Sequence, residues 1–324
     1  MIPFYIGNTD NTWFDFLKAR APLEEVNFWK PSPQTFKAVP FGAVFAFRLK
    51  APRNVIGGYG ILTSSTSIPI RLAWEAFGEA NGASSQHEVV AAIDQYRRNE
   101  TATELTHIGC RVLTQTVFLD EMDWIDTPSD WANSIVSGKT YDASVGEGRR
   151  VYEALMAKTD AAMLFRRDAR AWAPPGAGER PQPPIAGLPP RGGLTVGIRK
   201  VRPGQGTFRI NVAHAYRFAC AVSDTKVLPA LEAAHIQAYG RDGTHETANG
   251  LFLRRDIHSV FDAGFATFDE QMRFVVSPQV KTIFDNGNEY RRLHGSPIKA
   301  PDDPALRPDS RRMSWHRENV YVGD

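Results

Sequence analysis

A segment rich in proline and glycine interrupts the sequence at Ala173–Gly193, where twelve of the 21 residues are one or the other. Proline removes backbone donors and glycine weakens regular structure, so this segment cannot hold a helix and buries little apolar surface. We therefore expect a linker at 171–193 between a front domain at 1–170 and a back domain at 194–324. The length of 324 residues fits two domains of this size.

The composition is typical of a globular protein, with 42% hydrophobic and 23% charged residues. It excludes wholesale disorder, collagen-like repeats and coiled coil. No membrane span and no secretory signal is expected from the apolar runs, so we expect no membrane partner. Two cysteines, Cys110 and Cys220, are too few for a disulfide framework or a four-cysteine zinc site. These features favour a cytoplasmic protein with reduced thiols.

Charge is distributed unevenly along the chain. Residues 1–150 carry 14 Lys and Arg against 17 Asp and Glu, whereas residues 151–324 carry 24 against 19. A basic back half is compatible with nucleic-acid binding, although an ordinary mixed surface gives the same balance.

The front domain mixes strands and helices without regular alternation. Hydrophobic patterns predict strands at 4–9, 42–49, 54–62 and 108–119. Helices are predicted at 70–82, ended by Asn81-Gly82, at 84–100, capped by Ser84 or Ser85, and at 147–172. This mixture favours an α+β fold with a small barrel-like sheet over a doubly wound sheet.

The back domain is predicted to run from a helix through a strand that ends near His235, a polar loop, a second strand and a second helix. A hairpin is predicted at 265–277. On the second helix, His258 and Asp262 are four residues apart and stand on one face, where they could hold one cation together. A hairpin followed by a helix would bring the His235 strand against that face.

These residues resemble the HNH (ββα-metal) endonuclease family over about 195–324. The matching residues are Cys220–Val222, Leu231, Ala233–Ile236, Asn249–Leu251, Leu253, Arg254, Asp256, His258, Phe261, Asp262 and Gly264. The resemblance implies a C-terminal ββα-metal domain that hydrolyses phosphodiester bonds. It assigns catalytic roles to His235, Asn249 and His258.

In these roles, His235 would deprotonate the attacking water, and Asn249 would accept the other imidazole N–H or hold the loop. His258 would coordinate a single divalent metal ion, and the i+4 spacing adds Asp262 as a second ligand. We expect Mg²⁺ or Mn²⁺, with Ni²⁺, Co²⁺ or Zn²⁺ as further possibilities. No structural zinc is expected, because the chain lacks paired CxxC motifs.

One position departs from the family pattern. Many HNH enzymes have an acidic or histidine metal ligand immediately before the base, and here that position is Ala234. Asp262 is one candidate replacement, and Asp256 is another.

The front part resembles an EVE-like domain of the PUA superfold over roughly 1–140, through Asn27-Phe28-Trp29, the strand at 42–49 and the turn at 57–60. The resemblance implies a small β-barrel with helices that binds a flipped modified base. Stacking walls and polar partners for such a base are predicted at Trp13, Asn27, Trp29 and Tyr59. Asn8 and Trp74 are weaker candidates. Core packing is the alternative for the aromatic residues.

Together the two resemblances predict a modification-dependent (type IV-like) restriction endonuclease. Its partner would be double-stranded DNA with 5-methyl- or 5-hydroxymethylcytosine. A single HNH site cuts one strand, so double-strand cleavage needs a dimer or two binding events, and a homodimer is expected. One alternative is a conventional HNH endonuclease that reads unmodified DNA. The other is a non-catalytic PUA-like binder of modified RNA.

Overall fold

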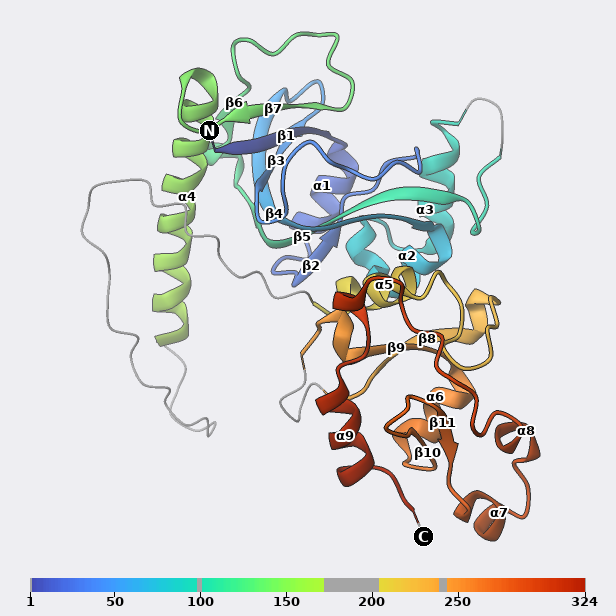
Figure 1. Cartoon of the computed structure of the whole chain (residues 1–324). Coiled ribbons are helices and arrows are strands. Elements are labelled where there is room, and N and C mark those ends of the chain that lie inside the picture. The colour runs from blue at the N-terminus through green and yellow to red at the C-terminus, as the bar shows by residue number, and fades with distance from the viewer. Residues whose placement is uncertain (1, 98–100, 172–203, 239–243, 324) are drawn as a thin grey trace. The chain divides into compact units, whose positions relative to one another are not determined.

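The computed structural model describes residues 2–97, 101–171, 204–238 and 244–323, and only the backbone of 159–171. These residues form a mixed α+β structure (Figure 1) that divides into two compact units. The first contains the described residues of Met1–Asn11, Ala38–Ile61 and Val117–Val201, and the second contains those of Thr12–Lys37, Leu62–Thr116 and Arg202–Asp324. The predicted linker lies almost wholly outside the described residues.

The first unit is built on β1 (Pro3–Thr9), which pairs in parallel with β3 (Val44–Leu49) and antiparallel with β7 (Gly138–Asp142). β4 (Val55–Pro69) continues the sheet beside β3 and also pairs with β6 (Ile125–Asp126). Helix α4 (Gly146–Ala171) packs on this unit through buried Val151 and Leu155. Its core also contains Phe4, Ile6, Val44, Ala46, Ile56 and Tyr59.

The front half of the chain supplies part of the second unit. Its elements are α1 (Asn11–Lys18), β2 (Glu25–Asn27), α2 (Ile70–Phe77), α3 (Gln86–Asp94) and β5 (His107–Phe118). Of the two predicted caps of α3, Ser85 occupies the N-cap, where its hydroxyl accepts a hydrogen bond from Glu88 N at 3.3 Å. Gly82 follows the short 3-10 turn after α2 with φ of 82°, as the predicted helix end requires.

The back half of the chain completes the second unit. Helix α5 (Gln205–Ala215) precedes the antiparallel pair β8 (Leu231–His235) and β9 (Gly250–Arg254), which leads directly into α6 (Arg255–Asp262). This is the predicted ββα order. The predicted hairpin also forms, from β10 (Ala266–Phe268) and β11 (Phe274–Val276). Helices α7 (Gln279–Phe284), α8 (Asn288–Arg291) and α9 (Ser310–Asn319) follow.

The predicted barrel is not confirmed. The strands of the front half form a seven-stranded sheet in the order β2-β5-β4-β3-β1-β7, with β6 beside β4. Among the described strand pairings, none joins β2 to β7, so the path stays open.

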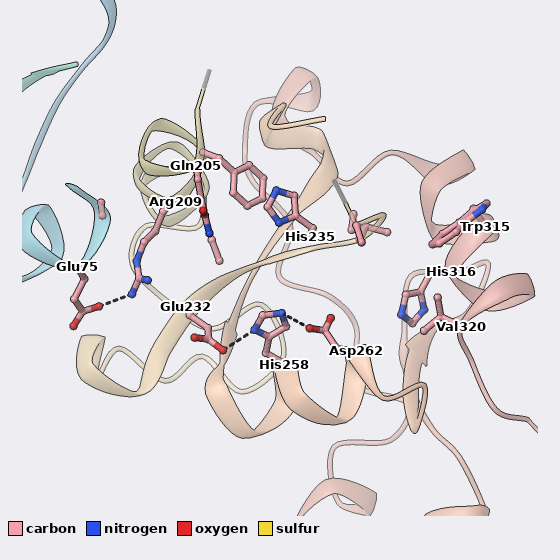
Figure 2. A pocket seen from close by; sticks show the side chains of 15 residues that line it. Glu75, Gln205, Arg209, Glu232, His235, His258, Asp262, Trp315, His316 and Val320 are labelled. Atoms are coloured by element: carbon pink, nitrogen blue, oxygen red, sulfur yellow. Dashed lines mark hydrogen bonds and ion pairs between the residues drawn. The ribbon is translucent and has the colours of Figure 1, made fainter. Parts of the chain in front are cut away.

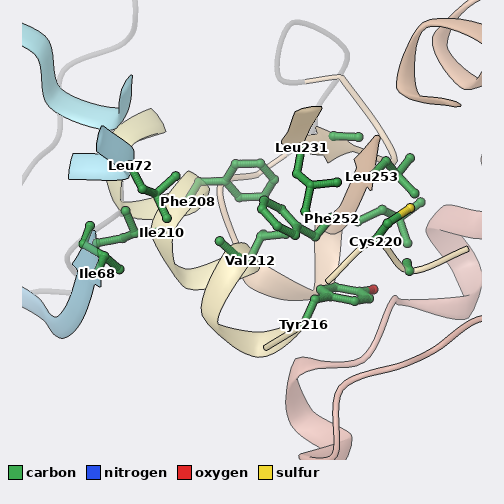
Figure 3. Close-up of a cluster of buried hydrophobic side chains, with 14 of the residues drawn as sticks. Ile68, Leu72, Phe208, Ile210, Val212, Tyr216, Cys220, Leu231, Phe252 and Leu253 are labelled. Atoms are coloured by element: carbon green, nitrogen blue, oxygen red, sulfur yellow. The ribbon is translucent and has the colours of Figure 1, made fainter. Parts of the chain in front are cut away.

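The second unit has one hydrophobic core that contains residues from both halves of the chain. Ile68 and Leu72 lie in the same cluster as Phe208, Ile210 and Val212 of α5 (Figure 3). The buried Glu25 carboxylate also accepts hydrogen bonds from Gly204 N at 2.9 Å and Thr207 N at 3.1 Å, at the start of α5. The two units defined by contacts therefore do not coincide with the predicted domains at 1–170 and 194–324. The predicted domain boundaries stay a prediction.

Both cysteines, Cys110 and Cys220, are buried free thiols. Within the described part of the chain, no helix is long and apolar enough to cross a membrane.

Candidate active site

The ββα unit sets the positions of the predicted catalytic residues. The two strands pair so that His235, the last residue of β8, lies opposite Gly250 at the start of β9. Helix α5 contacts both strands. A Cβ atom at Gly250 would lie only 2.4 Å from Val212 Cγ2 of α5, so only glycine permits this close approach. The glycine of the Asn-Gly-Leu motif thus has a packing role.

His235 lies against α5. Its imidazole stacks on the Phe208 ring, with 3.9 Å between the centroids and 9° between the planes. Its Nε2 lies 3.1 Å from His245 Nδ1. Burial, followed by the nearby charges of His245 and His258, lowers the pKa of His235 to about 4. The ring is therefore neutral at neutral pH and able to accept a proton.

Asn249 is fully buried and bridges the two ends of the loop after β8. Its Nδ2 donates to the carbonyls of Gln237 at 2.9 Å and Thr244 at 2.8 Å, and its Oδ1 accepts from Gln237 N at 3.0 Å. Of the two predicted roles, these contacts match the second, which is holding the loop. Because Thr244 precedes His245, the same contacts fix the chain beside His235.

His258, on α6, has a carboxylate at each ring nitrogen (Figure 2). Its Nε2 lies 3.0 Å from Asp262 Oδ2, which is the contact predicted from the i+4 spacing. Its Nδ1 lies 2.6 Å from Glu232 Oε1 on β8. Burial alone would lower the pKa of His258, but hydrogen bonds and negative charge from Asp262 and Glu232 raise it above its usual value.

The other predicted metal-ligand position does not join this group. Asp256 Oδ1 accepts a hydrogen bond from Arg254 Nε at 3.0 Å, and its pKa lies below the usual value mainly because of that partner. Ala234 is fully buried and offers no ligand. Glu232, two residues before Ala234 on β8, lines the cavity instead.

The donor chemistry of His258 and Asp262 fits a divalent cation. Adjacent ligands of an octahedral Mg²⁺, each about 2.1 Å from the ion, are about 3 Å apart. The 3.0 Å between His258 Nε2 and Asp262 Oδ2 matches this spacing. Among the described residues, no three His, Cys, Asp or Glu side chains form a metal cluster. Phosphate and water would have to complete the shell, as they commonly do for Mg²⁺.

These residues border a cavity of about 760 Å³. Its lining includes His235, His258, Asp262, Glu232 and, from α5, Arg209. Glu75 of α2 also lines it and forms an ion pair with Arg209 (Figure 2). The Glu75 carboxylate further lies 3.7 Å from Arg255 Nη2. The cavity therefore brings together the His235 imidazole, the His258–Asp262 pair and the Arg209 guanidinium.

Several groups in and around this cavity are not among the residues predicted from the sequence. Three of them line it: Glu232 on β8, Phe208 on α5 and Glu75 on α2. A fourth, His245, lies in the loop after β8 and contacts His235. Only Glu232 could have been found from the sequence, because it is a carboxylate two residues before Ala234, the position where many HNH enzymes have a metal ligand. The other contacts arise from packing between segments far apart in the sequence, which motif spacing does not reveal.

Three of the predicted base-pocket residues, Trp13, Asn27 and Trp29, lie around the Asn81-Gly82 turn of the second unit. Trp13 and Asn27 are buried in the second unit, whereas Tyr59 is buried in the core of the first. Asn27 Nδ2 donates to Asn81 Oδ1 at 2.9 Å, which is a core contact. Trp29 is half-buried, and its Nε1 donates to Asn81 O at 2.9 Å. Of the four, Trp29 keeps the most surface for a ligand.

Comparisons with known proteins identify one region. Residues 220–269 match a family model described as HNH endonuclease, and no curated protein matches the chain. Among solved structures, a mutant ZmASCH protein from Zymomonas mobilis shares 13% identity over 36% of this chain and 78% of its own, with a TM-score of 0.24. A modification-dependent TagI restriction endonuclease shares 11% identity over 92% of this chain and 75% of its own, with a TM-score of 0.28. Both TM-scores are too low to support a functional inference.

Proposed function

We propose that this chain, a nuclease by virtue of the HNH endonuclease domain at residues 220–269, is a modification-dependent DNA endonuclease. The observation that carries the nuclease assignment is the family match over the ββα unit. The geometry supports it, because His235, His258 and Asp262 line the same cavity. HNH nucleases generally depend on a divalent metal, and we propose Mg²⁺ or Mn²⁺ at His258 and Asp262.

In the proposed mechanism, His235 accepts the proton of the water that attacks the phosphodiester. Its low pKa keeps the imidazole unprotonated for this step. Asn249 holds the loop beside it, and Phe208 fixes the plane of the ring by stacking. His258 and Asp262 would hold the divalent ion, which would supply charge stabilisation for the leaving 3′ oxygen. Arg209 and Arg255 bind the neighbouring phosphates.

The front half is proposed to read the modification. It resembles the PUA superfold in sequence, and a flipped 5-methyl- or 5-hydroxymethylcytosine is the proposed ligand. Trp29 is the proposed stacking wall, because it is the candidate that retains exposed surface and its indole is held by Asn81. Cleavage of both strands would then require two copies of the single HNH site, hence a homodimer.

Digestion of phage DNAs that carry cytosine, 5-methylcytosine, 5-hydroxymethylcytosine or glucosylated cytosine tests this function. We expect Mg²⁺- or Mn²⁺-dependent cutting of one or more modified DNAs and little cutting of the plain DNA. Trp29→Ala in the full chain should remove most of that preference, because a lost stacking wall costs roughly 1–3 kcal/mol. Equal cutting of all four DNAs would leave a conventional HNH endonuclease. No cutting of any DNA would contradict the nuclease mechanism.

A further inference from the structure

His258 presents two different environments at its two ring nitrogens. The contact from Nε2 to Asp262 Oδ2 measures 3.0 Å, and the contact from Nδ1 to Glu232 Oε1 measures 2.6 Å. The two carboxylates lie on opposite edges of the ring (Figure 2). A metal ion can bind only one of these nitrogens from the cavity, so the two carboxylates cannot both be its ligands together with His258.

We propose that Glu232 is a positioning residue that holds the Nδ1–H of His258, so that Nε2 faces the metal ion together with Asp262. This inference rests on the proposed metal-dependent function. Metal-binding histidines commonly donate their second ring N–H to a carboxylate, which fixes the tautomer and the ring orientation. Nothing in the motif assigns this role to Glu232.

The two contact distances agree with this division of roles. Neighbouring ligands of an octahedral ion lie about 3 Å apart, which matches the Asp262 side. A separation of 2.6 Å is too short for two such ligands, but it suits a charge-assisted hydrogen bond. The Glu232 contact is therefore a hydrogen bond that remains when a metal ion binds on the other edge.

The surroundings of the two carboxylates agree with this assignment. The Glu232 side chain is 28% exposed, and its second oxygen lies 3.8 Å from Arg255 Nε, so it is held from both sides. The Asp262 side chain is 59% exposed and open to a cation. Asp262 also lies near enough to His235 for its charge to act on the pKa of that ring. His235, His258 and Asp262 line the same cavity.

Metal binding without DNA tests the proposal by a readout other than cleavage. We expect Glu232→Ala to weaken Mn²⁺ binding, measured by titration calorimetry, by about 10–100-fold. Glu232→Gln should weaken it less, because the amide oxygen still accepts the Nδ1–H bond. His258→Ala should lose the binding altogether. Asp256→Asn is the matched control, because Asp256 is held by Arg254, and it should keep the wild-type affinity.

Nitrogen-15 spectra of labelled histidines in the Zn²⁺-loaded protein give a second readout. Wild-type His258 should carry its proton on Nδ1 and the metal on Nε2, and Glu232→Ala should disturb that arrangement while far-UV circular dichroism stays unchanged. Equal Mn²⁺ affinity of the wild type and Glu232→Ala would overturn the positioning role alone. If Glu232→Gln lost Mn²⁺ binding as completely as His258→Ala, the positioning role would also be overturned, because that result would identify Glu232 as a metal ligand. A wild type that binds neither metal would overturn the metal-dependent function as well.

Discussion

At the scale of single residues, the environment of His235 determines at which pH the proposed base can work. Burial against Phe208 and the charges of His245 and His258 lower its pKa to about 4. A lowered pKa means that the ring stays neutral as the pH falls from 7 towards 4, and becomes protonated only near the lower value. An unperturbed histidine would already be half protonated near pH 6.5.

The pH dependence of cleavage follows from this shift. At saturating Mn²⁺, protonation of His235 should not reduce kcat/KM until the pH approaches 4. The pH profile of kcat/KM is the relevant measurement, because it reports the pKa values of catalytic groups in the free enzyme. The measurement is a set of initial cleavage rates on a short modified duplex between pH 4 and pH 8. A fall in kcat/KM centred near pH 6.5, unchanged by higher Mn²⁺, would show that the base has an ordinary histidine pKa.

Removal of the imidazole separates catalysis from binding. His235→Ala should reduce the cleavage rate by roughly 10²–10⁴-fold, because a general base acts in the transition state. The affinity for DNA, measured by fluorescence anisotropy without metal, should change little. Substantial cutting by this variant would mean that another group activates the water.

The motif residues could be predicted because their residue types and their spacing along the chain match the family pattern. His258 and Asp262 stand one helical turn apart, and the structure brings them within 3.0 Å as expected. Asn249 could be placed in the loop, but its two proposed roles could not be separated until its contacts were known. Glu232 was missed because its partner, His258, lies 26 residues away in the sequence. The two side chains meet only because β8 pairs with β9 and α6 follows β9 directly.

At the scale of elements, α5 depends on a residue far away in the sequence. Glu25 accepts hydrogen bonds from Gly204 N, Thr207 N and the Thr207 hydroxyl, which are groups at the first turn of the helix. A helix N-terminus has unpaired N–H groups and favours negative charge. Glu25 thus does what a local N-cap side chain usually does, from a separation of 182 residues.

Loss of this contact should lower the stability of the second unit. Glu25→Ala leaves buried donors without an acceptor and should reduce the free energy of unfolding by roughly 3 kcal/mol. Glu25→Gln keeps one acceptor oxygen, for Gly204 N and the Thr207 hydroxyl, but its amide NH2 would face Thr207 N, so a smaller loss of roughly 1–2 kcal/mol is expected. Urea unfolding followed by circular dichroism measures both, with the exposed neighbour Glu24→Gln as control. Equal stability of Glu25→Ala and Glu24→Gln would show that the contact contributes nothing.

Elements with local signals were predicted well. Ser85 and Gly82 mark helix ends through their own chemistry, and the β10–β11 hairpin formed where alternation predicted it. The barrel depended instead on strands that meet across long separations. Pairing of β2 and β7 would need a register that no local pattern specifies, and the described strand order does not confirm the barrel.

At the scale of the whole molecule, the front half of the chain contributes directly to the nuclease cavity. Glu75 of α2 pairs with Arg209 of α5, and both side chains are about four-fifths buried, with 19% and 21% exposed. The proline- and glycine-rich segment predicted two independent domains, but composition along the chain cannot reveal this ion pair or the shared core of the second unit. In the proposed DNA complex, Glu75 therefore competes with phosphate for Arg209.

Glu75→Gln should therefore strengthen DNA binding. Removal of the negative charge releases Arg209, and partly Arg255, for contact with phosphate. Each added phosphate contact makes the plot of the logarithm of the DNA-binding constant against the logarithm of the salt concentration steeper by about 0.9. We expect a several-fold lower Kd at low salt, a steeper slope, and convergence with the wild type at high salt, measured by fluorescence anisotropy without divalent metal. Glu79→Gln is the matched control, because Glu79 pairs with the exposed Arg20 instead. Weaker binding by Glu75→Gln at every salt concentration would show that Glu75 holds Arg209 in place for phosphate rather than competing with it.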